Sequence, residues 1–145
     1  MRVPVLAAGG VVDSRTIRAA FQLGASGVQV GTLFIPSLES AASEPYKDAV
    51  IAAKDTDTAL TRAFSGRWAR GIRNEFMRTM EASGIAIPDY TIQNSLTAGL
   101  RAYGQKNNHP EVVSLWAGQS AGKARRGGTA DILQGLVKGI DYLWA

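Results

Sequence analysis

The chain has 145 residues, of which 46% are hydrophobic and 19% are charged, a balance typical of folded globular proteins. It has no cysteine and a single histidine, which excludes disulfides and thiol chemistry and argues against a metal site made of protein ligands alone. No apolar run approaches the length of a membrane span, and the N-terminus lacks a signal-peptide pattern. We therefore expect a cytoplasmic protein with no membrane partner.

The positive charge of the chain is dispersed. Sixteen Lys and Arg residues against 12 Asp and Glu residues give a net charge of +4 without a long basic run. No aromatic and basic platform or zinc-finger spacing accompanies this charge. We expect it to serve an anionic cofactor and predict no nucleic-acid partner.

The first 36 residues predict a strand, a helix and a second strand. Val3–Ala8 is a nearly continuous apolar run, typical of a parallel strand that is covered on both faces. Asp13 or Ser14 can cap the following helix, and Gly27–Val30 predicts a short second strand. The helix has its apolar face at Ile17, Ala20, Phe21 and Gly24.

Each predicted strand ends in a glycine turn. Gly9 and Gly10 follow the first strand, and Gly31 and Thr32 follow the second. Glycine lets a backbone approach a ligand closely, and the amides of such turns and of a following helix bind phosphate. These four residues are therefore candidate phosphate ligands. The alternative is that the glycines only make tight turns.

The length of the chain restricts the fold. Two consecutive glycine turns of this kind belong to the phosphate site after strands 7 and 8 of a (β/α)8 barrel, but a whole barrel needs about 250 residues. Because the chain enters a strand directly after Met1 and Arg2, we interpret it as the C-terminal portion of a longer α/β TIM-barrel enzyme. Residues 1–36 would form its βαβ phosphate-binding unit and residues 37–145 a mainly helical region, together one partial domain.

Four helices are predicted in residues 37–145. They are Glu44–Lys54, Asn74–Ser83, Thr91–Tyr103 and a last helix that Thr129 caps. The third has an apolar stripe, and the last has a wide apolar face that must pack on something. The stripe consists of Ile92, Leu96, Leu100 and Tyr103, and the face of Ile132, Leu133, Leu136, Val137, Ile140, Leu143 and Trp144.

The segment between the first two of these helices is ambiguous. Thr56, Thr58, Leu60 and Thr61 favour a strand, whereas the apolar spacing from Ala59 to Phe64 also fits a helix. We choose an extended segment.

Three arginines follow at a spacing of three, which would place them on one side of a helical turn. Arg67, Arg70 and Arg73 are either a solvated basic face, or one of them binds an acidic group or a phosphate. His109 precedes a proline in a polar loop, so we expect it at the surface and not as a general base.

Three segments resemble one family. Ala7–Gly10 followed by Asp13, together with Leu23–Thr32, is similar to the flavin-phosphate region of nitronate monooxygenases, formerly called 2-nitropropane dioxygenases. Phe64–Asn74 and Ser114–Gly122 resemble the same family in the same order, so the similarity covers nearly the whole chain. The first motif is common to phosphate-binding barrels, whereas the three together are much more specific.

The resemblance implies an FMN-dependent enzyme that oxidises alkyl nitronates with O2 to a carbonyl compound and nitrite. The cofactor-binding residues that we predict are Gly9, Gly10, Gln29, Val30, Gly31, Thr32 and Gln119. Gln119 lies in the small-residue segment Ala117–Gly122, where a planar ligand could lie against the backbone; close helix packing is the alternative.

The chain departs from the family in two places. The family's catalytic base is a histidine from an earlier part of the barrel, which nothing here matches, so we assign no catalytic residue. Leu33 stands where the family often has arginine. Two alternatives therefore stay open: another flavin barrel, of the enoyl-reductase or inosinate dehydrogenase type, or a non-catalytic fragment that associates with other subunits or with itself.

Overall fold

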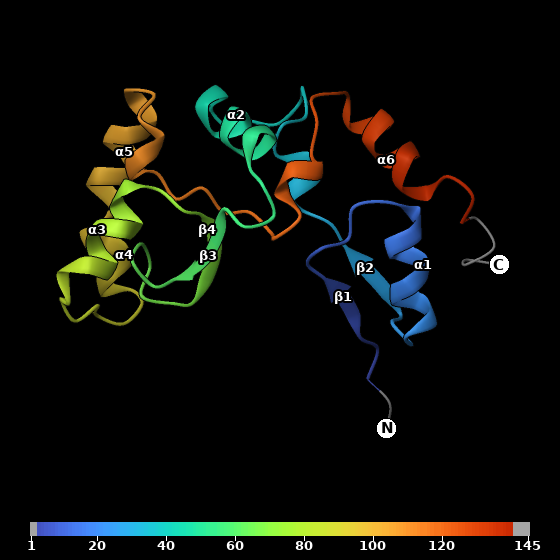
Figure 1. Cartoon of the computed structure of the whole chain (residues 1–145), viewed down its shortest axis with the longest axis horizontal. Helices are drawn as coiled ribbons and strands as arrows, with labels where there is room; N and C mark the ends of the chain where they lie inside the picture. Colours follow the sequence, from blue (N-terminus) through green and yellow to red (C-terminus); the bar gives the residue numbers. More distant parts are fainter. Residues whose placement is uncertain (1–2, 141–145) are drawn as a thin grey trace.

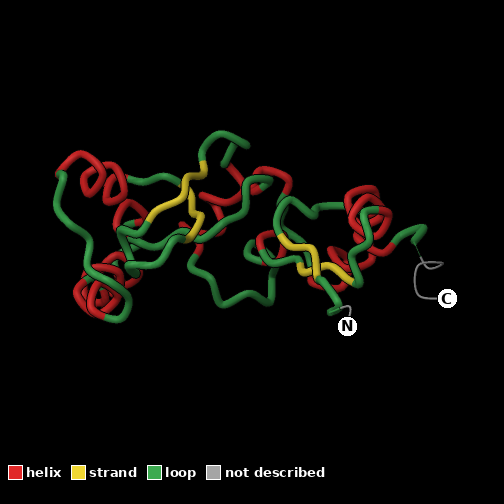
Figure 2. Tube along the Cα trace, turned by 90° about the horizontal axis from the view of Figure 1, so that it is seen from below, coloured by secondary structure: helices red, strands yellow, loops and turns green. Residues whose placement is uncertain are grey.

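A computed structural model describes residues 3–140 of the chain. In this range a parallel strand pair lies at one end of an elongated molecule and an antiparallel hairpin with three helices at the other, with α2 between them (Figures 1 and 2). The strands are β1 (Leu6–Ala8), β2 (Gly27–Gln29), β3 (Thr58–Thr61) and β4 (Ala69–Ile72). The α-helices are α1 (Ser14–Gln22), α2 (Glu44–Ala52), α3 (Glu75–Ser83), α4 (Ile92–Leu96), α5 (Ala98–Lys106) and α6 (Thr129–Val137). Short 3-10 turns are η1 (Thr32–Phe34), η2 (Pro110–Val112) and η3 (Ala121–Lys123).

The predicted βαβ unit is present. β1 and β2 pair in parallel, with Leu6 opposite Gly27 and Ala8 opposite Gln29. Asp13 caps α1 as predicted: its carboxylate accepts from the Thr16 amide at 2.8 Å, and the Thr16 hydroxyl accepts from the Asp13 amide at 3.0 Å. This hydrogen bond from the Thr16 amide, helped by Arg15, holds the pKa of Asp13 below its usual value against the opposing effect of burial.

β1 is not covered on both faces, contrary to the prediction. Leu6 is 61% exposed and Val5 is equally open to solvent, and within residues 3–140 the only strand that pairs with β1 is β2. An apolar run of this kind requires a second neighbouring strand and covering layers to be buried. The described part of the chain does not supply them.

The ambiguous segment is a strand, as chosen, but the arginines are not on a helical turn. β3 pairs with β4 in an antiparallel hairpin that includes Arg70, while Arg67 precedes β4 and Arg73 follows it. The residue spacing fitted a helix, but the ladder to β3 decides the conformation here. The region 37–145 therefore contains a two-stranded sheet besides its helices.

A third extended segment adds to this hairpin. The Ile72 amide donates to the Leu115 carbonyl at 2.8 Å, and the Ala117 amide donates to the Arg70 carbonyl at 3.2 Å. A Cβ on Gly71 would lie 2.9 Å from the Leu115 carbonyl oxygen, so glycine is required for this close approach.

The predicted helix over Thr91–Tyr103 is two helices, α4 and α5, and the predicted apolar stripe faces solvent. Leu96 is 68% exposed, whereas Gln93 and Thr97 on the opposite face are buried. Gln93 Nε2 donates to the Ala63 carbonyl, and Thr97 Oγ1 donates to the Phe64 carbonyl at 2.6 Å. These hydrogen bonds to buried carbonyls fix the rotation of α4, which hydrophobic periodicity could not reveal.

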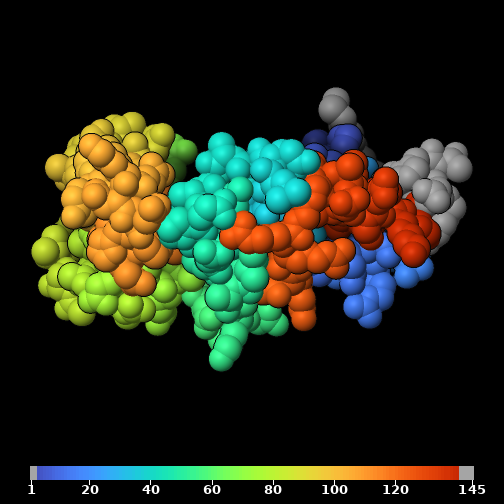
Figure 3. Space-filling model, turned by 90° about the horizontal axis from the view of Figure 1, so that it is seen from above, coloured from blue at the N-terminus to red at the C-terminus, as the bar shows by residue number. Residues whose placement is uncertain are grey.

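The remaining helices form near their predicted positions. α2 buries Val50, and α3 ends at Gly84 with a φ of 66°. Thr129 does not cap α6: its amide and hydroxyl instead donate to the Glu39 carboxylate at 2.9 and 2.8 Å. α6 packs on α1 and η1, beside the N-terminal unit (Figure 3), and its predicted residues Leu143 and Trp144 lie outside the described range.

One buried cluster runs through both halves of the chain, and α2 is tied to it. Tyr46 Oη donates to the Trp116 carbonyl at 2.5 Å, and burial raises the pKa of Tyr46 to about 12. The cluster contains Val11, Ile17, Leu33, Val50, Ala53, Ile72, Val113, Leu115, Ala117, Ala121, Ala124, Ile132, Leu136 and Ile140. Among the described residues, no helix is both long and apolar enough to cross a membrane.

Replacing Asn74 with alanine should lower the free energy of unfolding by about 2–4 kcal/mol, since buried polar groups lose their partners. Asn74 Nδ2 donates to the Pro110 and Val113 carbonyls at 3.0 and 2.8 Å, and Oδ1 accepts from the Met77 amide. The control is Asn107→Ala, because Asn107 is exposed and bonds a single carbonyl. Urea denaturation of both variants measures the difference, and equal stabilities would contradict the role of Asn74.

Replacing Tyr46 with phenylalanine should cost about 1 kcal/mol near neutral pH, the net value of one hydrogen bond. The pKa of Tyr46 is about 12 in the folded chain against an ordinary value of 10.0, so the protonated form is favoured by folding. The stabilisation of the folded chain by protonated Tyr46 is complete below pH 10 and is lost as the pH rises from 10 to 12. Denaturation at pH 8 and pH 11 should therefore show a smaller decline for Tyr46→Phe than for the unmodified chain.

Candidate functional site

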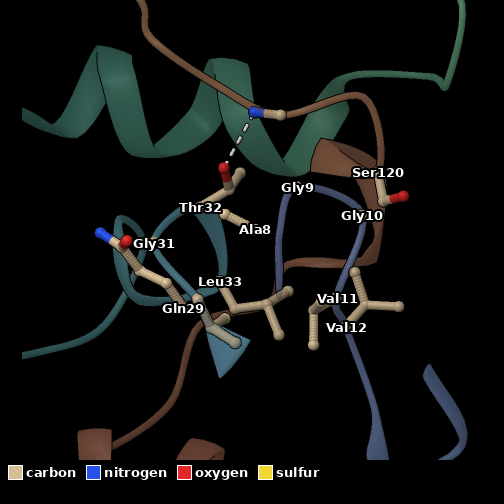
Figure 4. A pocket seen from close by; sticks show the side chains of 12 residues that line it. Ala8, Gly9, Gly10, Val11, Val12, Gln29, Gly31, Thr32, Leu33 and Ser120 are labelled. Atoms are coloured by element: carbon tan, nitrogen blue, oxygen red, sulfur yellow. Dashed lines mark hydrogen bonds between the residues drawn. The ribbon is translucent and has the colours of Figure 1, made fainter. Parts of the chain in front are cut away.

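The two glycine turns meet at one cavity. Both follow the carboxyl ends of the parallel strands β1 and β2, which lie at the same edge. The cavity has a volume of about 290 Å³, and Figure 4 shows its lining side chains. It is lined by Ala8, Gly9, Gly10, Val11, Val12, Gln29, Val30, Gly31, Thr32, Leu33, Gly118 and Ser120. Six of the seven predicted cofactor-binding residues are therefore brought together, and Gln119 is not among them.

Backbone conformation requires glycine at Gly9 and Gly10 but not at Gly31. Gly9 and Gly10 have φ angles of 87° and 72°, so turn geometry alone accounts for glycine at both positions. Gly31 has a φ of −118°, which any residue can adopt, and a Cβ there would meet no atom within 4 Å. The tight-turn alternative thus explains the first pair but not Gly31, where the open space suits a ligand.

The first turn of α1 does not offer its amides to this cavity as expected. The Asp13 carboxylate accepts from the Thr16 amide, and the Thr16 hydroxyl accepts from the amides of Val12 and Asp13 at 3.0 Å each. The capping box uses the Asp13 and Thr16 amides and places a negative charge there, and neither Ser14 nor Arg15 lines the cavity. An anion in the cavity must find its donors elsewhere.

The two glycine turns provide such donors. Within residues 3–140, the backbone N–H groups of Gly10, Gly31 and Thr32 donate to no protein acceptor. The Thr32 hydroxyl accepts from the Gly118 amide at 2.9 Å, the dashed line in Figure 4. The Thr32 hydroxyl donates to no acceptor within residues 3–140, so its hydrogen can donate to a ligand.

A second cavity of about 620 Å³ adjoins the first. Gln119 lines it, together with Asp55 and Arg70, and neither charged residue was among the predicted site residues. Arg70 is half-buried, and its Nη1 donates to the carbonyl and the hydroxyl of Thr58 at 3.3 and 3.2 Å. The two cavities share Ala8, Gly9, Gly10, Gly118 and Ser120.

Sequence reasoning missed Ser120, Asp55 and the placement of Arg70. Ser120 belongs to the small-residue segment from which only Gln119 was chosen. The sequence did not distinguish Arg70 from Arg67 and Arg73, whereas the β3–β4 hairpin places Arg70 at the cavity. Arg67 instead lies 4.5 Å from the centre of the Tyr90 ring. No local signal marked Asp55.

Two further expectations from the sequence concern His109, which lies outside the site, and Leu33, which lies in its wall. His109 is exposed in the loop between α5 and η2 and lines neither cavity, which confirms its surface position. Leu33 is buried in the cavity wall, so no guanidinium is present at that position. Within residues 3–140, no cluster of three metal-ligating side chains exists.

A family model and curated relatives both match this chain as nitronate monooxygenases. The family model described as nitronate monooxygenase matches residues 1–139. A probable nitronate monooxygenase of Staphylococcus aureus (strain Newman) is 43% identical over 141 residues, which are 97% of this chain and 40% of the relative. The chain thus spans about two fifths of the length of the curated relatives it matches.

Solved structures agree with the sequence match. A nitroalkane oxidase from Streptomyces ansochromogenes is similar with a TM-score of 0.87 and 35% identity, covering 94% of this chain and 39% of that protein. FabK from Thermotoga maritima is similar with a TM-score of 0.80 and 32% identity, covering 99% of this chain and 46% of that protein. The family-model match over residues 1–139 and the 43% identity to the Staphylococcus aureus relative show that the chain belongs to the nitronate monooxygenase family.

Proposed function

We propose that the chain is the C-terminal part of a (β/α)8 barrel and that its first cavity binds the phosphate of FMN. Residues 1–36 then correspond to strands 7 and 8 of the barrel with their connecting helix, and residues 37–145 to the region that follows it. One observation carries this proposal: two glycine turns with free N–H donors converge at the carboxyl ends of two parallel strands.

The residues present fit this cofactor. Phosphate offers only acceptors at neutral pH, and the Gly31 and Thr32 amides with the Thr32 hydroxyl are donors at the first cavity. The adjoining cavity of about 620 Å³ lies within the size range of cofactor sites and begins at the shared turn of Gly9 and Gly10. A phosphate in one cavity and a planar ring in the other suit a single elongated ligand.

Each predicted residue then has a role in binding. Gly31 and Thr32 hold the phosphate, and Gly9 and Gly10 let the backbone pass close to the ligand. Gln29 and Val30 complete the wall at the end of β2, and Gln119 offers its amide in the second cavity. Bound FMN supplies the redox chemistry, while the protein supplies position and polarity.

The reaction that we propose for the longer enzyme is oxidation of alkyl nitronates by O2 to a carbonyl compound and nitrite. The described chain offers no histidine as base, since His109 is exposed and outside both cavities. We therefore assign binding residues to this chain and no catalytic residue.

A flavin barrel of the enoyl-reductase type is the second candidate, because FabK is structurally similar with a TM-score of 0.80. The match to nitronate monooxygenase relatives at 43% identity favours the first candidate. A non-catalytic role in a larger assembly is compatible with the exposed apolar residues of β1.

Replacing Gly31 with aspartate should abolish FMN binding, because a side chain and a negative charge would enter the phosphate position. The structure has no atom within 4 Å of the new Cβ, so the fold should tolerate the change. Gly99→Asp is the matched control, since Gly99 is exposed on α5 with equally open space. Gly104 would be unsuitable as a control, because it is buried in α5 against Val112 and Val113. Equal FMN affinity of the two variants in a fluorescence titration would refute the phosphate assignment.

The isolated chain should release no nitrite from a small alkyl nitronate, even with excess FMN. It lacks a histidine at either cavity, and the flavin would face loops that lie outside these residues. The apolar residues of β1 should also cause self-association, which size-exclusion chromatography would detect. Flavin-dependent turnover by a stable monomer would contradict this prediction.

A further inference from the structure

Among the arginines of residues 3–140, Arg70 combines partial burial, a position in a cavity wall and the lack of a carboxylate partner. Arg15, Arg62, Arg78 and Arg126 each have a carboxylate within ion-pair distance. Within residues 3–140, Arg70 has none, although it lines a cavity and is half-buried. A guanidinium in such a position has donors and charge available for a ligand.

The position of Arg70 is fixed from two directions. Nη1 donates to both oxygens of Thr58 on the neighbouring strand, at 3.3 and 3.2 Å. The backbone carbonyl of Arg70 accepts from the Ala117 amide at 3.2 Å, two residues before Gln119. The guanidinium and the Gln119 segment therefore belong to one hydrogen-bonded unit at the cavity. Such support preorganises a binding residue.

A negative charge also lies at this cavity, on the exposed side chain of Asp55. Asp55 lines it with Arg70, and within the described residues Asp55 has no ion-pair partner either. A phosphate or a nitronate offers only acceptor oxygens, so Arg70 would attract it but Asp55 would repel it. A ligand that has both acceptors and an N–H donor satisfies both side chains.

The pyrimidine ring of a flavin has this combination. Its N1 and C2 carbonyl are acceptors, and its N3–H is a donor. We propose that Arg70 binds the N1–C2 edge of the flavin ring, with Asp55 accepting from N3–H, and that Arg70 thereby favours the reduced ring. This inference rests on the proposed function. Reduction increases negative charge at N1, and a nearby cation is one of the groups by which a protein tunes flavin electronics.

The experiment uses two ligands, FMN and riboflavin, which differ only in the phosphate. Arg70→Gln should weaken binding of both ligands by the same factor, about tenfold, the effect of losing one charge-assisted hydrogen bond. Gly31→Asp should instead weaken FMN strongly and leave riboflavin nearly unchanged. Arg73→Gln is the matched control, because Arg73 is exposed just after β4 and lines neither cavity.

A second measurement tests the effect on reduction and separates it from a structural role. Arg70→Gln should lower the midpoint potential of bound FMN, by about 30 mV if the reduced form loses tenfold more affinity than the oxidised form. Arg70→Lys keeps the charge and should restore most of the potential, even if the contacts to Thr58 are weakened. Loss of hairpin packing alone would lower both affinities without this rescue, and circular dichroism would report loss of fold.

Several outcomes would overturn the inference. If Arg70→Gln weakens FMN but not riboflavin, Arg70 binds the phosphate and not the ring. If neither affinity nor potential changes while Gly31→Asp still abolishes FMN binding, the proposed function stands and the role of Arg70 is wrong. If the unmodified chain binds neither ligand, the proposed function and this inference both fail.

Discussion

The parallel pairing of β1 with β2 is the constraint on which the site depends. It brings the carboxyl ends of both strands to one edge, so turns more than twenty residues apart in the sequence face the same cavity. α1 spans the connection, and its capping box uses the amides of Asp13 and Thr16. The free amides of Gly31 and Thr32 lie at this cavity, whereas no residue of α1 lines it.

An extended segment joins this unit to the rest of the molecule. Residues 115–118 accept from Ile72, donate to the Arg70 carbonyl and reach the Thr32 hydroxyl through the Gly118 amide. Tyr46 holds the same segment from α2. The three motifs that resemble the nitronate monooxygenase family are therefore in physical contact.

Two sets of exposed apolar side chains have different causes. Val3, Val5 and Leu6 lie in or just before β1, which pairs on only one side within residues 3–140. Ile92 and Leu96 lie on α4, whose other face is held by the buried hydrogen bonds of Gln93 and Thr97. Burial of the first set would require a second neighbouring strand and a covering layer, which residues 3–140 do not supply. Nothing among residues 3–140 covers the second set.

The sequence by itself determined the elements whose signals are local. The β1–α1–β2 order, the Asp13 cap, the end of α3 at Gly84 and the glycine turns follow from side-chain type and spacing, because these depend on neighbouring residues only. Tertiary structure decided the rest. It placed Arg70 on a strand and exposed the apolar stripe of α4 to solvent. It also set Glu39 as the acceptor at the start of α6 and brought Asp55 and Ser120 to the cavities. Each of these outcomes rests on a partner distant in sequence: a ladder strand, a buried carbonyl or a carboxylate some ninety residues away. Periodicity within one segment contains no information about such partners, so only the folded chain could assign them.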